Sequence, residues 1–287
     1  MEILVTGATG TIGSHLVKLL QAFGASFKAM VRSKENAQLF ESHGFKTVMG
    51  DFNDPDSLDK AFAGIDNLFL LTSPSPNQVA EQSNALVAAQ KGGIQKIVKV
   101  SAIGTKLDSA VKLFHWHAET EEQIRTSGIN HTFLHPQSFM QNFFQYIPSI
   151  QGQNAIYAPM KESRIPMIDA RDIGMVAAKI LSEDGHEGKT YTLTGPEPIS
   201  YQQIAELFTE QLGRPIEYVD IPMEAAEKAM LDMGMPNWLV SDLIALNQGS
   251  VNQGTVEANQ AVKQITGIEA TSFSQFLQDH LEIFKGQ

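Results

Sequence analysis

The chain has 287 residues, of which 43% are apolar and 18% charged, and its formal net charge is −11. This composition is typical of a globular protein with one large domain or two modest ones. Because the chain has no cysteine, disulfides, cysteine-ligated zinc, iron–sulfur clusters and thiol nucleophiles are excluded. The acidic charge disfavours nucleic acid as a partner. With no signal-like start and no apolar run of membrane-spanning length, we expect a soluble, cytoplasmic protein.

The first half of the chain alternates short β-rich runs with amphipathic helical stretches. Strands are expected at residues 2–6, 27–31, 45–49, 67–71, 96–100 and 131–134. Helices are expected at residues 11–22, 35–42, 77–91 and 111–126, with a further helix starting at Asp54 and Pro55. This alternation predicts an α/β fold with a Rossmann-type, doubly wound parallel sheet.

The second half is less regular and mostly helical. Residues 152–159 resemble a loop, 164–168 and 189–194 are expected as strands, and 171–181 as a helix. Ser200 is expected to cap a helix that runs to residue 212, and a break falls at 234–236. We therefore divide the chain into a Rossmann domain at 1–155 and a smaller region at 156–287, which completes the sheet and forms the substrate cleft.

A glycine-rich segment links the first strand to the first helix. Gly7 permits a tight turn, Gly10 lets a diphosphate approach the backbone, and Gly13 lets the helix pack close to the sheet. Amides at the helix start can donate to phosphate oxygens, helped by the helix dipole. Strand, turn and helix follow in the right order, so we expect phosphate binding by Gly7, Thr9, Gly10, Thr11, Ile12 and Gly13.

Arg32 follows the second strand, where proteins that select NAD tend to carry an acid. An arginine there, with Lys34 close behind, attracts the 2′-phosphate of NADP instead. The positive charges of Arg32 and Lys34 therefore favour NADP(H) over NAD(H). A solvated surface arginine is the alternative.

Further polar residues stand where strands end, the edge at which such sheets bind ligands. Asp51 can accept a hydrogen bond from the adenine amino group and Phe52 can cover the ring, although Asp51 is also a plausible turn residue. Thr72 and Ser73 end the fourth strand, and Ser101 ends the fifth.

The sequence resembles the NmrA-like group of atypical short-chain dehydrogenases, which includes NADPH:quinone oxidoreductases and triphenylmethane reductases. The motifs that carry the resemblance are GATGTIG, Val-Arg at 31–32, Gly-Asp at 50–51, and the segments 133–143 and 185–195. It implies an NADP(H) site that uses the glycine turn, Arg32, Thr72, Ser73 and a loop containing Pro136, Ser138 and Phe139. It also implies a substrate pocket beside the Rossmann part.

The sequence departs from this pattern in two respects. Ordinary short-chain dehydrogenases carry Tyr-x-x-x-Lys on the helix after the fifth strand, whereas His117 and Glu121 take those places here. Relatives often have arginine where His135 stands. His117 and Glu121 share a helix face, so the imidazole becomes a catalytic candidate, a proton donor with a raised pKa. A plain surface pair is the alternative.

The aromatic segment 139–146 can form one wall of a pocket for a flat acceptor, although most of its rings are expected in the core. Trp238 and the methionines at 223, 230, 233 and 235 are also expected in the core more than in a pocket. The histidines show no zinc spacing, so no metal site is predicted.

Without the tyrosine and lysine, the site suits acceptors that need mainly hydride delivery. The leading hypothesis is therefore an NADPH-dependent oxidoreductase that reduces a small, aromatic, electron-poor acceptor of the quinone, dye or iminium kind. The alternative is a non-catalytic NADP(H)-binding redox sensor that regulates a protein partner. A sugar-nucleotide epimerase is disfavoured by the missing pair. The residues leave both a monomer and a homodimer open.

Overall fold

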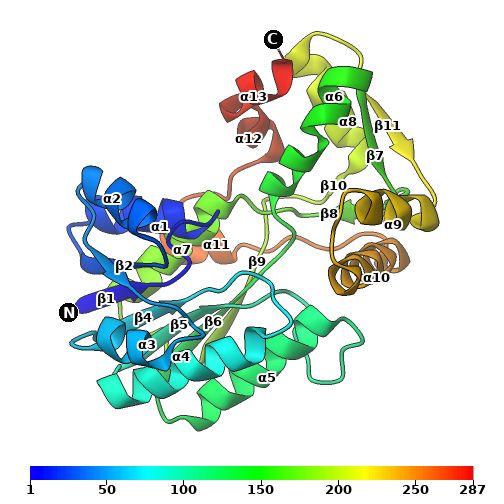
Figure 1. The fold of residues 1–287 in the computed structure, drawn as a ribbon. Helices are drawn as coiled ribbons and strands as arrows, with labels where there is room; N and C mark the ends of the chain where they lie inside the picture. The colour runs from blue at the N-terminus through cyan, green and yellow to red at the C-terminus, as the bar shows by residue number, and fades with distance from the viewer. Residues whose placement is uncertain (287) are drawn as a thin grey trace. The chain divides into compact units, whose positions relative to one another are not determined.

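A computed structural model describes residues 1–286, which form two compact units (Figure 1). Unit 1 comprises residues 1–136, 170–193 and 261–268, and unit 2 comprises 137–169, 194–260 and the described residues from 269 onward. The chain thus returns to unit 1 twice, and a single boundary at residue 155 does not describe it. Gln287, the last residue of the expected C-terminal region, lies outside the described residues.

Unit 1 is built on a seven-stranded sheet in which all neighbouring strands are parallel, in the order β3-β2-β1-β4-β5-β6-β9. The strands are β1 (Glu2–Val5), β2 (Ser26–Val31), β3 (Thr47–Met49), β4 (Asn67–Leu70), β5 (Lys96–Val100), β6 (Asn130–Pro136) and β9 (Lys189–Leu193). This confirms the predicted Rossmann-type sheet.

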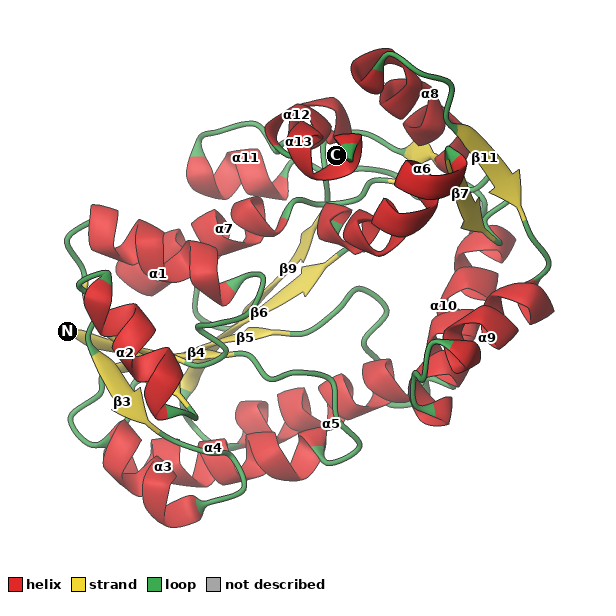
Figure 2. Ribbon diagram, turned by 45° about the horizontal axis from the view of Figure 1, so that its top comes forward, coloured by secondary structure: helices red, strands yellow, loops and turns green. Residues whose placement is uncertain are grey.

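Helices cover both faces of this sheet (Figure 2). One face carries α1 (Gly13–Ala22), α2 (Lys34–Ser42), α7 (Ala170–Ser182) and α11 (Ala261–Thr266). The other carries α3 (Pro55–Phe62), α4 (Gln78–Gly92) and α5 (Lys112–Thr126). Because β4 and β5 lie between the two layers, every residue in them is buried.

The helix boundaries follow the expected capping chemistry. The Asp54 side chain accepts a hydrogen bond from the Ser57 amide at the start of α3. Gly93 ends α4 in the left-handed conformation, with a φ of 74°. Ser200 forms a capping box with Gln203 at the start of α8 (Tyr201–Leu212).

Unit 2 combines helices with two small sheets. A parallel pair joins β7 (Ala155–Ala158) to β11 (Glu217–Asp220), and an antiparallel pair joins β8 (Arg164–Ile165) to β10 (Ile199–Ser200). Its other helices are η1 (Met140–Tyr146), α6 (Ile147–Gln153), α9 (Met223–Asp232), α10 (Asn237–Gln253), α12 (Phe273–Asp279) and α13 (Leu281–Lys285). The loop predicted at 152–159 is therefore wrong, because that segment contains the end of α6 and a strand.

The core of unit 2 is aromatic. Phe143 packs against Tyr146, Tyr201 and Phe273, while Phe144 packs against rings from α12 and α13. This confirms that most rings of the segment 139–146 serve the core. The expectation of a core position is wrong for Met233, which is 68% exposed at the end of α9. Met223, Met230, Met235 and Trp238 are only half-buried.

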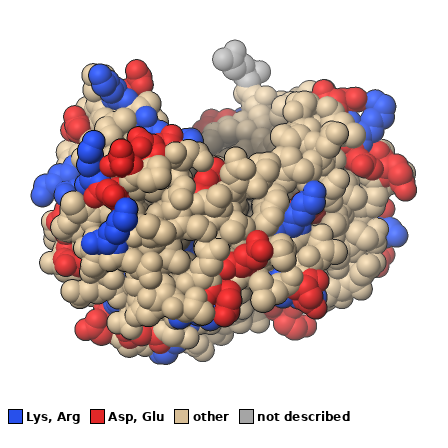
Figure 3. Space-filling view, turned by 60° about the horizontal axis from the view of Figure 1, so that its bottom comes forward, with Lys and Arg blue, Asp and Glu red and all other residues tan. Residues whose placement is uncertain are grey.

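On the face drawn in Figure 3, acidic and basic side chains are scattered among uncharged ones, and the described residues form no continuous basic area there. Within residues 1–286, no helix has the length and apolar character needed to cross a bilayer.

Candidate active site

The turn between β1 and α1 has the backbone geometry that a diphosphate requires. Gly7 has a φ of +62°, and a Cβ there would lie 2.9 Å from the carbonyl oxygen of Leu71. A Cβ on Gly13 would lie 2.2 Å from the carbonyl oxygen of Gly7, so α1 packs directly on the turn. Gly10 is exposed, and a Cβ there would meet only the Gly7 carbonyl oxygen, at 3.3 Å. Its outer side is therefore open to a ligand.

Two amides of this turn are available as donors. The N–H groups of Thr11 and Ile12 have no acceptor among the described residues. Free N–H groups ahead of a helix favour an anion, because the helix dipole adds to their partial charges. The backbone here thus fits the diphosphate of NADP(H). The predicted phosphate-binding residues all lie in this one turn: Gly7, Thr9, Gly10, Thr11, Ile12 and Gly13.

Arg32 lies directly after β2, at the same edge of the sheet. It is exposed, and its guanidinium contacts no acceptor among the described residues. It is therefore free to bind an anion such as the 2′-phosphate of NADP(H).

The residues after β3 form a closed turn. The Asp51 carboxylate accepts a hydrogen bond from the Asn53 amide at 2.9 Å, and the Asp51 amide donates to Ser57 Oγ at 2.9 Å. The Phe52 carbonyl accepts from Asn84 Nδ2 at 2.9 Å. Asp51 thus has the turn role that the sequence left open. An adenine contact for Asp51 and Phe52 stays a prediction.

Thr72 follows β4 and is held by a buried glutamine. Gln82 Nε2 donates to Thr72 Oγ1 at 2.7 Å, which leaves the threonine hydroxyl hydrogen free to donate elsewhere. Gln82 Oε1 is buried without a partner in the described part of the chain. The neighbouring Ser73 is exposed. Both Thr72 and Ser73 lie at the edge where a dinucleotide would bind.

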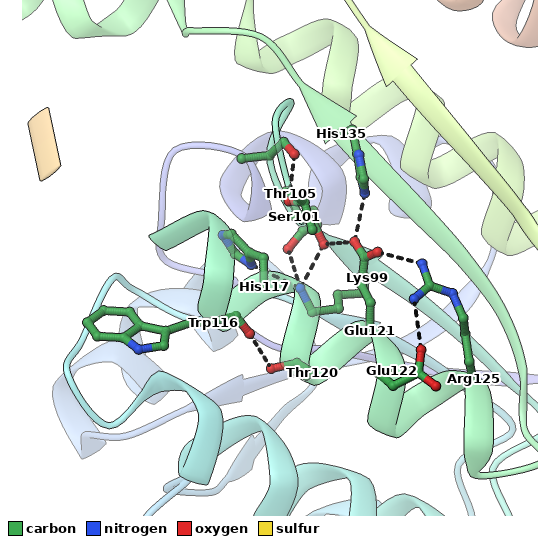
Figure 4. A network of polar contacts seen from close by, with 12 residues as sticks. Lys99, Ser101, Thr105, Trp116, His117, Thr120, Glu121, Glu122, Arg125 and His135 are labelled. Carbon is green, nitrogen blue, oxygen red and sulfur yellow. Dashed lines mark hydrogen bonds and ion pairs between the residues drawn. The ribbon is translucent and has the colours of Figure 1, made fainter. Parts of the chain in front are cut away.

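A cluster of polar side chains lies under α5, on the face of the sheet formed by β5 and β6 (Figure 4). Lys99 and Ser101 share one face of β5 because their side chains are two residues apart. The β5–β6 register pairs Val100 with Leu134, so Ser101 lies beside His135. From α5, His117, Glu121 and Arg125 follow at intervals of four residues and face the same way.

Glu121 is the hub of this cluster. Its side chain is 2% exposed, and Oε1 accepts hydrogen bonds from Ser101 Oγ at 2.5 Å and from His135 Nε2 at 2.7 Å. Oε2 accepts from Arg125 at 2.8 Å. Burial by itself would raise the pKa of Glu121, but the hydrogen bonds from His135 and Ser101 and the charges of His135 and Lys99 lower it below its usual value. The carboxylate is therefore ionised.

Lys99 is fully buried beside this hub. Its Nζ donates to Ser101 Oγ at 2.8 Å and lies 3.0 Å from His117 Nδ1. Burial lowers the pKa of Lys99 to about 7, although the charge of Glu121 opposes this shift and that of Arg125 adds to it. Lys99 is not among the residues that the sequence motifs indicate. A lysine inside an apolar, fully buried strand was the available signal.

The structure changes the interpretation of His117. Its partners are Lys99 and Gln78, whose Nε2 lies 3.2 Å from His117 Nδ1, and Glu121 pairs with His135 instead. The expected raised pKa is wrong. Burial and the neighbouring charges of Lys99 and His135 lower the pKa of His117 well below its usual value, so the ring is neutral at pH 7. The proton-donor role remains a hypothesis, now for a neutral imidazole.

The loop after β6 divides between the units. Pro136 ends β6 in unit 1, and its carbonyl accepts from the Ile103 amide at 3.1 Å. Ser138 and Phe139 belong to unit 2, where the Ser138 carbonyl accepts from the Ile168 amide and Phe139 forms a bridge with Ile168. Cofactor contacts at these three residues stay a prediction.

The doubly wound sheet, the open glycine turn and the free arginine together define a dinucleotide-binding Rossmann protein. The chain belongs to the NmrA-like family, whose model matches residues 1–277. It is 37% identical over 285 residues to an NAD(P)H azoreductase of Xenophilus azovorans, covering 98% of this chain and 99% of the relative.

Two solved structures have the same fold along nearly the whole chain. Triphenylmethane reductase of Citrobacter is 25% identical with a TM-score of 0.88, covering 98% of this chain and 100% of the other. The NADPH complex of an NADPH-dependent quinone oxidoreductase from Escherichia coli is also 25% identical with a TM-score of 0.88, covering 97% and 99%.

Proposed function

We propose that this chain transfers a hydride from NADPH to a small, electron-poor acceptor such as an azo dye or a quinone. The observation that carries the proposal is the 37% identity to an NAD(P)H azoreductase over 98% of the chain. The NADPH complex of the similarly folded quinone oxidoreductase supports the choice of cofactor. The free amides at Thr11 and Ile12 and the unpaired Arg32 supply the binding groups that this cofactor needs.

NADPH, when bound, supplies the hydride, and the protein supplies position and electrostatics. The turn amides would hold the diphosphate, and Arg32 would hold the 2′-phosphate. His117 keeps a proton on one ring nitrogen beside the buried cluster. No Tyr-x-x-x-Lys pair is required, because an electron-poor acceptor takes hydride without a strong acid beside it.

The direct test follows NADPH absorbance during incubation with azo dyes, cationic dyes and quinones. Turnover with any of them supports the enzyme. Tight NADPH binding with no turnover across the panel would overturn the proposal and favour the redox-sensor alternative.

Arg32→Glu tests the cofactor assignment. We expect NADPH affinity to fall about 100-fold, since charge-assisted hydrogen bonds are lost and a like charge faces the 2′-phosphate. NADH affinity should change far less, because NADH lacks that phosphate. Isothermal titration with both dinucleotides measures the two affinities.

Lys18→Glu is the matched control for this experiment. It reverses another exposed positive charge, in the second turn of α1. Equal losses of NADPH affinity in the two variants would show a general charge effect and contradict the role of Arg32.

A further inference from the structure

Lys99 carries a fully buried amine, and the proposed hydride transfer gives this amine no role. Among the described residues, no carboxylate lies within ion-pair distance of its Nζ. Its three N–H donors meet three acceptors, namely the Val100 carbonyl at 3.4 Å, Ser101 Oγ at 2.8 Å and His117 Nδ1 at 3.0 Å. A buried ammonium without a direct counter-ion is costly, so this arrangement calls for an explanation.

The contacts of Lys99 set the tautomer of His117. Nδ1 faces two donors, Lys99 Nζ at 3.0 Å and Gln78 Nε2 at 3.2 Å. It therefore carries no hydrogen, and the ring hydrogen lies on Nε2. His117 is only part-buried, and its Nε2 has no partner among the described residues. That N–H is left unused by the protein.

The other charged groups near Lys99 are already engaged. α5 contributes Glu121 and Arg125, and β6 contributes His135; Arg125 and His135 both donate to the Glu121 carboxylate. Glu121 reaches Lys99 only through the Ser101 hydroxyl. α4 contributes the uncharged Gln78. Within the described part of the chain, the one neutral basic nitrogen in direct contact with Lys99 is thus His117 Nδ1.

We propose that Lys99 is a positioning residue for proton transfer. It holds His117 with its hydrogen on Nε2. It returns a proton to the ring once that hydrogen has been given to the reduced acceptor. This inference rests on the proposed function. The proposed function identifies NADPH as the source of the hydride, whereas this inference identifies the source of the proton.

The step balances for a quinone acceptor. Hydride addition supplies two electrons and one hydrogen, and leaves a hydroquinone anion. The anion takes the His117 Nε2 proton while an N–H bond of the Lys99 ammonium breaks and an Nδ1–H bond forms. Lys99 is left as a neutral amine, and His117 is left with its hydrogen on Nδ1 and a bare Nε2. Solvent then protonates Nε2 while the Nδ1 proton returns to Lys99, which restores both starting forms. The lowered pKa of Lys99, about 7, makes both of its forms accessible near neutral pH.

Two acceptors separate proton transfer from hydride transfer. Menadione needs a hydride and a proton, whereas crystal violet is a cation that hydride alone neutralises. In Lys99→Met the ratio of the menadione kcat to the crystal violet kcat should fall at least about tenfold, since a positioned proton donor contributes about 10²–10⁴-fold. His117→Gln should lower the same ratio. An unchanged ratio in both variants would overturn the proposal.

Two further variants test whether Lys99 acts by donating a proton or only through its packing and charge. Lys96→Met removes another buried lysine of β5, one that reaches the carbonyl oxygens of Ile180 and Glu183 on the opposite face. It should leave the ratio unchanged. Lys99→Arg keeps a positive charge but cannot release a proton near neutral pH, so it should lower the ratio as Lys99→Met does. Rescue by arginine would show a structural role only.

The pH profile gives a second readout. The ammonium form of Lys99 is the donor, so the menadione kcat/KM should fall as the pH rises through about 7, while the crystal violet profile lacks this limb. The limb should vanish in Lys99→Met. Its persistence there would contradict the assignment.

The tautomer can be measured without turnover. Nitrogen NMR on histidine-labelled protein should find His117 with hydrogen on Nε2 and a bare Nδ1 at pH 7. A hydrogen fixed on Nδ1 would overturn the proposal, even if dyes and quinones are reduced. If wild-type protein reduces no acceptor, the proposed function fails, while this spectrum still decides what Lys99 does to His117.

Discussion

At the scale of single residues, Glu121 holds the buried cluster together. It accepts hydrogen bonds from Ser101, His135 and Arg125, and its side chain is 2% exposed. Glu121→Gln removes the charge and leaves buried donors poorly paired, so we expect a loss of about 3 kcal/mol in the free energy of unfolding. Urea unfolding at pH 7 measures it. Because Glu121 no longer balances Lys99, the pKa of Lys99 should fall further.

The neighbouring Glu122→Gln is the control, since Glu122 is 55% exposed and also pairs with Arg125. It should cost less than about 1 kcal/mol. The pKa of Glu121 is lower in the folded state than in the unfolded state. Its contribution to stability is therefore complete above the unfolded pKa of about 4.3 and is lost as the pH falls through the folded pKa. The difference in the free energy of unfolding between wild type and Glu121→Gln should therefore become smaller as the pH falls. A difference that stays constant would contradict the ionised state of Glu121.

The same cluster shows what residue patterns can and cannot predict. The spacing of His117 and Glu121 correctly places both on one helix face, since that follows from helix geometry alone. Their partners depend on β5 and β6, which lie far away along the chain. His135 takes the carboxylate and Lys99 takes the imidazole. The sequence of one helix does not show which residues of distant strands bind its side chains instead.

At the scale of elements, the contact between α1 and the phosphate turn depends on one missing side chain. A Cβ at Gly13 would lie 2.2 Å from the Gly7 carbonyl oxygen and 2.7 Å from Ala8 Cα, which are both backbone atoms. In Gly13→Ala the helix must move away from the turn. We expect stability to fall by more than about 2 kcal/mol and NADPH binding to be lost, as measured by thermal unfolding and calorimetry.

Gly249→Ala is the matched substitution. Gly249 lies inside α10 with no atom within 4 Å of an added Cβ, so alanine should stabilise the protein by about 0.5–1 kcal/mol. A Gly13→Ala protein that binds NADPH as tightly as wild type would refute the close packing of helix on turn.

Elements with local signals were predictable and those with distant partners were not. Asp54 and Ser200 mark helix starts through their own side-chain chemistry, and both predictions are confirmed. β7 is only four residues long and pairs with β11 some sixty residues later. Nothing in its own sequence distinguishes it from a loop.

At the scale of the whole molecule, the two units share one interleaved chain. β9 pairs with β6 along five residues, from Thr132 with Lys189 to Pro136 with Leu193. α7 packs against α1 and against α11, and eight of its residues are buried. The sequence predicts both elements. It does not show that the chain leaves unit 1 between β6 and α7, because composition hardly changes there.

This interleaving predicts how fragments behave. A fragment of residues 1–155 ends before α7 and β9, so β6 becomes an open edge and the core under α1 is exposed. We expect it to aggregate or to unfold without cooperativity. A fragment of residues 1–193 regains α7 and β9, so circular dichroism should report a cooperative thermal transition for it alone. A cooperative transition in the shorter fragment would show that the single boundary at residue 155 describes the folding unit after all.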